Sequence, residues 1–185
     1  TRFAEAMPHV RVRVLDGYAR AIASQVNGGE VEFGLAVRMG THYELEFTSV
    51  VTEHFVAVCR HDHPLADRDS VTWDELANHR LIGNTVIAQA LRMSTLQPYY
   101  EFEAEQISTA VSFVKHGLGV TLLPAFEQHQ PGYQDLRKLR VSGPEVTREI
   151  CFMTRPDMPL SRPARMLMEH ITEHLHHIAR REGPC

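Results

Sequence analysis

The polar residues best suited to holding a small molecule stand where predicted strands end and predicted helices begin. Asn84 and Thr85 follow one apolar strand, and Arg38 ends another. Ser108 lies at the start of a predicted helix, whose unbonded N–H groups and positive dipole end attract anions. We therefore expect a site for a small anion such as a carboxylate, with turn and capping roles as the structural alternatives.

Three further features bear on that site. Phe126 follows the strand predicted at residues 120–123 and could supply an apolar wall, with simple packing as an equal alternative. Glu105 precedes the helix of Ser108, and its carboxylate would oppose an anionic ligand unless a cation intervenes. The Arg38 guanidinium could pair with an acid, and its alternative is a solvated side chain.

The sequence contains no motif typical of an enzyme. There is no G-x-S-x-G, no phosphate-binding G-x-x-x-x-G-K-[ST], no C-x-x-C and no H-E-x-x-H. His170, His174 and His177 stand at helical spacing and could bind zinc or nickel weakly, but a solvated helix face is the expected role. We expect no catalytic residue, no metal and no cofactor.

Composition and charge are those of an ordinary globular protein rather than of a nucleic-acid binder. The 185-residue chain is 43% hydrophobic and 23% charged, with a net charge of −4 at pH 7. Because no basic stripe is visible, another segment would have to bind DNA if the protein acts on it. The three cysteines show no short spacing, and no apolar run is long enough to span a membrane, which predicts a cytoplasmic protein.

Hydrophobic periodicity predicts alternating strands and helices, the pattern of an α/β fold. Residues 10–14 alternate Val and Arg and predict a half-buried strand, and residues 33–37 predict a strand in the covered middle of a parallel sheet. Thr72 and Glu75 have the spacing of a capping box. We expect the other strands at residues 45–51, 55–59, 80–83, 99–103, 120–123, 136–139 and 148–153, and helices at residues 1–7, 18–26, 88–95, 107–116 and from residue 159 or 161 onward.

The alternation of strands and helices breaks at two places, near His61 and again at residues 155–159. Such breaks are typical of crossovers between two lobes that share one chain. We therefore expect a first lobe made of residues 1–61 and 154–185. A second lobe, residues 62–153, is inserted between these two segments.

Three stretches carry a resemblance to one known protein family. The first is VNGGEVEFGL at residues 26–35, and the second is the turn HPLA at residues 63–66. The third, FVKHGLGVTLLP at residues 113–124, is similar to the family's signature of a helix end, a G-L-G turn and an apolar strand. Each motif alone is common. In this shared order and spacing the chain resembles, over nearly its whole length, the regulatory half of the LysR family of transcription regulators.

This resemblance implies an α/β fold of two Rossmann-like lobes with mixed, mostly parallel sheets. Two crossover segments would join the lobes, as in type II periplasmic binding proteins, and an effector would bind in the cleft between them. The resemblance also implies that Glu105, Gln106 and Ile107 line the cleft, with Asn84 and Thr85 at the matching position after their own strand.

The same resemblance implies partners. Effector domains of this kind pair side by side, which predicts a homodimer or homotetramer held by the helices at residues 18–26 and 108–116. A small-molecule effector would shift the population of dimer geometries. DNA would be bound by a winged helix-turn-helix upstream. The change in dimer geometry would alter the spacing between the DNA-binding domains and therefore their fit to successive half-sites. No membrane partner is expected.

The chain departs from the family at its beginning. Family members open this domain with a central strand and a polar loop, and neither is found here, nor is the winged helix-turn-helix. Loss of a central strand leaves the backbone groups of its neighbours unpaired, so we expect the chain to be a fragment. The loop normally contacts the effector, so part of any binding site would lie outside this sequence.

Two other functions stay open at this point. A solute-binding protein of a transport system has a similar fold, and an export signal upstream would decide for it. An enzyme on this fold would be recognised by turnover of its bound ligand.

Overall fold

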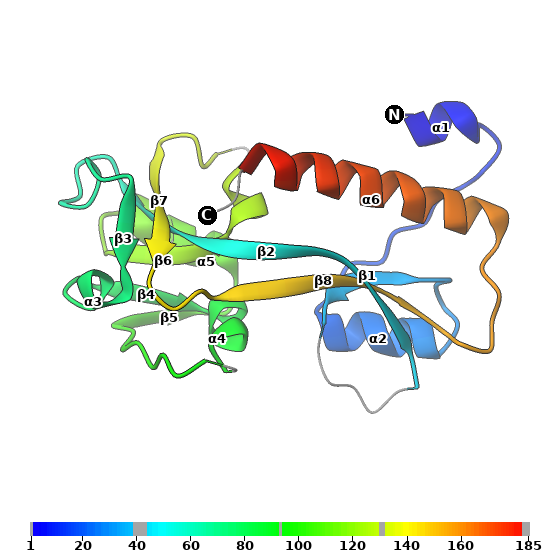
Figure 1. The fold of residues 1–185 in the computed structure, drawn as a ribbon, viewed down its shortest axis with the longest axis horizontal. Coiled ribbons are helices and arrows are strands. Elements are labelled where there is room, and N and C mark those ends of the chain that lie inside the picture. The colour runs from blue at the N-terminus through cyan, green and yellow to red at the C-terminus, as the bar shows by residue number, and fades with distance from the viewer. Residues whose placement is uncertain (1, 39–43, 93, 130–131, 183–185) are drawn as a thin grey trace. The chain divides into compact units, whose positions relative to one another are not determined.

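The computed structural model describes residues 2–38, 44–92, 94–129 and 132–182 (Figure 1). The chain forms two compact units. Unit 1 combines the chain up to Thr52 with the chain from Arg148 onward, and unit 2 is Glu53–Thr147. The boundaries between the units fall within the strands β2 (Glu46–Arg60) and β8 (Thr147–Thr154), which is why these limits differ from the lobe limits at residues 61 and 154. Those lobe limits stay a prediction.

Unit 1 contains an antiparallel strand pair with helices on it. The pair is β1 and β8, in a register that runs from Gly34 opposite Met153 to Val37 opposite Ile150. Ala23 and Val26 of α2 form a small core with Met153. The elements wholly or mainly in this unit are α1 (Arg2–Ala6), α2 (Ala19–Asn27), β1 (Gly34–Val37), β8 (Thr147–Thr154) and α6 (Arg162–Glu182).

Two predictions for unit 1 are wrong. Residues 10–14 form no strand, and Val12 and Val14 are 46% and 73% exposed. The Val–Arg alternation defines two faces, but a strand also needs a neighbour to bond to, and no described residue pairs with this segment. The strand β1 is likewise not in the middle of a parallel sheet, because it pairs antiparallel with β8 and ends the strand order of the described sheet.

The strands predicted at residues 45–51 and 55–59 are one continuous strand, β2. The polar residues between them suggested a break. In the structure Glu53 is only 1% exposed and continues the strand, because the backbone N–H of Phe126 donates a hydrogen bond to its Oε1 at 2.7 Å. A partner from another element thus makes a buried carboxylate compatible with an uninterrupted strand.

Unit 2 is a mixed sheet, as predicted. β2 pairs antiparallel with β6 and β7, whereas β4 runs parallel to both β5 and β6, and β3 runs parallel to β7. The strands are β3 (Ser70–Thr72), β4 (Leu81–Asn84), β5 (Phe102–Ala104), β6 (Val120–Pro124) and β7 (Leu136–Ser142), and the helices are α3 (Trp73–Leu76), α4 (Thr85–Leu91), α5 (Ile107–Lys115) and the 3₁₀ helix η1 (Ala125–His129).

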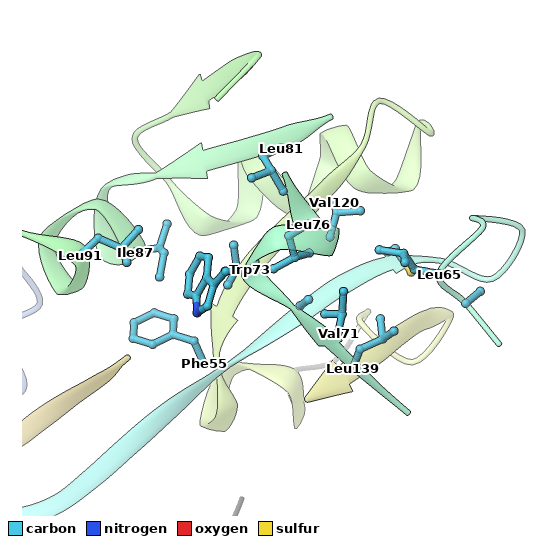
Figure 2. Packing of buried hydrophobic residues seen from close by; sticks show 14 residues of the cluster. Phe55, Leu65, Val71, Trp73, Leu76, Leu81, Ile87, Leu91, Val120 and Leu139 are labelled. Atoms are coloured by element: carbon cyan, nitrogen blue, oxygen red, sulfur yellow. The ribbon is translucent and has the colours of Figure 1, made fainter. Parts of the chain in front are cut away.

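Alternate residues of β2 enter two different cores of unit 2. Phe55 and Ala57 pack with residues of α3 and α4, including Trp73, which lies among the labelled side chains of Figure 2. Val56 and Val58 pack on the opposite face with residues of α5. The period of two along a strand therefore places one helix layer on each face of this sheet.

Local signals set the helix limits of unit 2. Thr72 Oγ1 accepts a hydrogen bond from the N–H of Glu75 at 3.2 Å and the Glu75 side chain accepts one from the N–H of Thr72 at 2.8 Å, which confirms the capping box. The predicted helix over residues 107–116 is confirmed as α5. α4 begins three residues before the predicted residue 88, because Asn84 caps it.

His63, in the turn after β2, packs against His79, which follows α3, and this pair should make stability depend on pH. The ring centroids of His63 and His79 lie 4.9 Å apart, and His63 Nδ1 accepts a hydrogen bond from the N–H of Leu65 at 3.2 Å. Burial first, and then the positive charge of His79, lower the pKa of His63 below its ordinary 6.5. The folded protein binds this proton less readily than the unfolded chain, so the free energy of unfolding falls as the pH drops below 6.5.

The variant His63→Asn should weaken this loss of stability in acid. Its Oδ1 can accept the same N–H bond, as Asn does in turns, but it does not titrate. The measurement is the melting temperature between pH 8 and pH 5.5, with His61→Asn at the exposed neighbouring position as the control. Equal slopes for wild type and His63→Asn would assign the pH dependence to other groups.

Candidate functional site

The carboxyl ends of three parallel strands meet at one edge of unit 2. In the register of the sheet, Asn84 of β4 lies opposite Ala104 of β5, and Ile82 of β4 lies opposite Thr121 of β6. At this edge each strand is followed by a helix. β4 leads directly into α4 and β6 directly into η1, whereas a two-residue turn separates β5 from α5. Parallel strands of α/β proteins hold ligands at such an edge.

All of the site residues predicted from the sequence except Arg38 lie at this edge, and Arg38 lies in unit 1. We call this group the strand-end cluster. Its members are Asn84, Thr85, Glu105, Gln106, Ile107, Ser108 and Phe126.

Asn84 is 3% exposed and its amide is fully occupied within the protein. Oδ1 accepts hydrogen bonds from the N–H groups of Val86 and Ile87, both at 3.1 Å. Nδ2 donates to Leu122 O at 2.9 Å and to Thr121 Oγ1 at 3.4 Å. Since an amide side chain offers two acceptor and two donor positions, Asn84 uses all four to cap α4 and to join β4 to β6.

Two buried polar residues of this edge were missed by the sequence analysis. Thr121 is fully buried in β6, and its hydroxyl donates to Ile82 O at 2.8 Å. Glu53 holds the first turn of η1 through the backbone N–H of Phe126. The available signal was a polar residue inside an apolar run, at residues 120–123 for Thr121 and within β2 for Glu53.

The first turn of α5 presents backbone donors. The first hydrogen bond along the helix runs from Ala110 N to Gln106 O, so the N–H groups of Ile107, Ser108 and Thr109 have no partner inside the helix. Gln106 is the N-cap residue and makes no capping bond with its side chain, so Ser108 lies in the first turn and is not the N-cap. Together with the helix dipole, these donors favour a negative group at this end.

The side chains around that turn differ in exposure. Ile107 is partly buried against the core of Val56 and Val58, whereas Glu105 and Ser108 are exposed. Thr85 is partly buried as the first residue of α4, and the ring of Phe126 is partly buried as well. The strand-end cluster thus combines backbone donors and a hydroxyl with apolar surface, and Glu105 is its exposed acidic member.

Arg38 is held by partners within unit 1. Its guanidinium forms an ion pair with Glu149, donates to Phe47 O at 3.3 Å and lies 5.5 Å from the centroid of the Phe47 ring. A hydrogen bond with Ser49, followed by that with Arg38, lowers the pKa of the Glu149 carboxyl. The Glu149 carboxylate therefore already neutralises the Arg38 charge, and a ligand role for Arg38 stays a prediction.

The described part of the chain contains no group of three or more His, Cys, Asp or Glu side chains that could hold a metal ion. On α6, His170 Nδ1 lies 2.8 Å from Met166 O, and His176 Nε2 lies 2.8 Å from Val50 O. These contacts give two of the histidines of this helix structural partners. No helix in the described ranges is both long and apolar enough to cross a membrane.

Comparisons with known proteins agree on one family. A model of the LysR substrate binding domain matches residues 1–176. The chain is 29% identical over 167 residues to the uncharacterized HTH-type transcriptional regulator YbhD of Escherichia coli (strain K12), covering 86% of this chain and 53% of that protein. It therefore spans about half the length of that curated relative.

Solved structures show the same fold. The BenM effector binding domain with its effector benzoate superimposes with a TM-score of 0.80 at 18% identity, covering 95% of this chain and 83% of that one. The effector binding domain of QuiR in complex with shikimate superimposes with a TM-score of 0.77 at 15% identity, covering 94% and 86%. At these identities the likeness establishes the shared fold.

Proposed function

Because the chain belongs to the family of LysR substrate binding domains, we propose that it is the effector-sensing domain of a transcription regulator and that its effector is a small anion. The proposal of an anionic effector rests on the first turn of α5. Three backbone N–H groups without a helical partner lie there, at the strand-end edge of unit 2. The predicted location of the ligand between two lobes stays a prediction.

Similar domains support an anionic effector. Benzoate and shikimate, the ligands named for the BenM and QuiR domains, both carry a carboxylate. A carboxylate oxygen is an acceptor suited to the N–H groups of Ile107, Ser108 and Thr109. Apolar surface from Ile107 and Phe126 would contact the body of such a ligand. Glu105 restricts how a ligand can bind. Because the Glu105 carboxylate repels the carboxylate of the ligand, the ligand's carboxylate must lie on the side toward the N–H groups of α5.

The wider role belongs to the whole regulator. We propose that the domain forms homodimers or homotetramers through α2 and α5, and that another part of the protein binds DNA. The domain catalyses no reaction in this proposal, in keeping with a family of transcriptional regulators, and the protein acts in the cytoplasm. YbhD is named as a transcriptional regulator, and the BenM and QuiR domains are effector binding domains, which favours this function over a solute-binding protein of a transport system.

A thermal-shift screen tests the anion proposal. Benzoate, shikimate and a panel of other small carboxylates are added to the protein, with the corresponding amides as uncharged controls. A ligand at one hundred times its Kd stabilises the fold by about 2.7 kcal/mol, which raises the Tm by roughly 2–4 °C per kcal/mol. If acids and amides give the same response, the anionic effector is excluded.

The variant Ser108→Glu should weaken carboxylate binding and leave the fold intact. A carboxylate in the first turn stabilises a helix, but it would compete with the ligand for the N–H groups of α5. We expect the affinity to fall at least about tenfold. Ser112→Glu, the same change one turn further along at another exposed position, is the control and should bind like wild type. Loss of binding in both variants would move the site away from this turn.

A further inference from the structure

Unit 1 contains a pocket that is separate from the strand-end cluster. It opens beside the loop that joins β8 to α6 and has a volume of about 380 Å³. That volume falls in the range of sites for small molecules, about 300–1,000 Å³. The pocket is lined by Glu46, Thr154, Arg155, Pro156, Asp157, Met158, Pro159, Leu160 and Arg165.

Arg155 carries a buried hydrogen-bond donor that no described residue satisfies. Its Nε is buried without a partner. The guanidinium packs against Gly29, where an added Cβ would lie 2.8 Å from Nη1, and Gly29 has a φ of +75° that other residues rarely adopt. The close fit at Gly29 holds the Arg155 side chain in place. Nε itself is enclosed, but Arg155 lines the pocket, so its positive charge acts on a ligand bound there.

The charges that line the pocket are balanced. Arg155 and Arg165 are cations, Glu46 and Asp157 are anions, and none of the four belongs to an ion pair among the described residues. A simple anion would meet two carboxylates there, and a simple cation would meet two guanidinium groups. A molecule that carries both charges avoids either repulsion.

Apolar surface lines the remainder of the pocket. Met158 is 50% exposed, which is unusual for a large apolar side chain, and Leu160 and two prolines lie beside it in the loop. An apolar substituent on the ligand would cover this surface and gain about 25 cal/mol for each Å² removed from water. The lining thus combines two charges of each sign with an apolar wall.

We propose that this pocket binds a free α-amino acid with an apolar side chain. The ligand's carboxylate is attracted by Arg155 and Arg165, its ammonium group is held by Glu46 and Asp157, and its side chain packs on Met158 and Leu160. This site lies within unit 1 and is independent of the carboxylate site proposed in unit 2.

Calorimetric titration of the whole 185-residue chain with L-leucine tests the proposal. Two analogues each lack one charge: 4-methylpentanoate lacks the ammonium group, and 3-methylbutylamine lacks the carboxylate. We expect leucine to bind and each analogue to bind at least about tenfold more weakly, since a charge-assisted hydrogen bond contributes more than one decade of affinity. Equal binding of leucine and 4-methylpentanoate, or no leucine binding up to about 10 mM, would overturn the proposal.

A second measurement locates the site. With ¹³C-labelled methionine methyl groups, leucine should shift the Met158 signal, which is assigned by its loss in Met158→Leu. Arg155→Met and the exposed-site variant Glu46→Gln should each weaken leucine binding at least about tenfold, whereas Arg20→Met on the exposed face of α2 should not. Wild-type affinity in Glu46→Gln, or leucine binding without a Met158 shift, contradicts the pocket. Ser108→Glu should leave leucine binding unchanged. A failure of the amino-acid pocket in unit 1 can therefore be distinguished from a failure of the carboxylate site in unit 2.

Discussion

Replacing Asn84 with alanine should lower the free energy of unfolding of unit 2 by about 3 kcal/mol. The change removes the cap of α4, which is two hydrogen bonds to Val86 and Ile87, and leaves the buried carbonyl of Leu122 without its donor. Each buried group that loses its partner retains the cost of desolvation. Urea unfolding followed by the fluorescence of Trp73, the single tryptophan and part of the unit 2 core, measures this loss.

Two further variants separate the contributions of Asn84. Asn84→Ser keeps an N-cap oxygen but does not reach Leu122, so it should lose about half as much stability as the alanine variant. Asn78→Ala removes an exposed amide that donates to Asp74 O at 2.9 Å and should change stability by less than about 0.5 kcal/mol. If Asn84→Ala is no less stable than Asn78→Ala, the four-bond role of Asn84 is wrong.

The variant Gly119→Ala should destabilise unit 2 by about 3 kcal/mol or more. A Cβ at position 119 would lie 2.2 Å from the carbonyl oxygen of Arg80. That oxygen cannot move away without loss of its hydrogen bond from Val120 N at 2.9 Å, which begins the pairing of β6 with β4. The substitution therefore separates the two strands whose ends carry the strand-end cluster.

Gly28→Ala is the matched control for Gly119→Ala. Gly28 ends α2 with an ordinary helical φ of −74°, and an added Cβ would lie 3.3 Å from Ser24 O. We expect its stability to stay within about 1 kcal/mol of wild type. The measurement is again urea unfolding, with circular dichroism for Gly28 because Trp73 reports on unit 2. A Gly119→Ala protein as stable as wild type would show that β4 and β6 tolerate a wider separation.

The site predictions that depend on strand ends were accessible from the sequence. The strands predicted at residues 80–83 and 99–103 end within one residue of the observed ends, Asn84 and Ala104, and the ends of parallel strands share one edge of a sheet. The apolar face of residues 107–114 identified α5, and the motif at residues 113–124 identified the helix–turn–strand that follows it. These features are local, because each depends on side-chain spacing within one or two elements.

The roles of individual polar groups were not accessible in the same way. Asn84 follows a strand as a ligand-binding residue would, yet its oxygen caps the adjacent helix α4 and its amide donates to Thr121 and Leu122 of β6, which is distant in the sequence. Glu53 resembled a break between two strands because its partner Phe126 lies 73 residues away. Whether a polar side chain is free to bind a ligand depends on these non-local partners.

By itself the sequence determined the alternation of helices and strands, the family and the edge at which the strand-end cluster lies. Periodicity and caps encode these properties within short segments. Only the tertiary structure decided that residues 10–14 form no strand, that β2 continues through Glu53 and that Asn84 is fully bonded. The reason is physical: a strand needs a neighbour and a buried polar group needs a partner, and both come from distant parts of the chain.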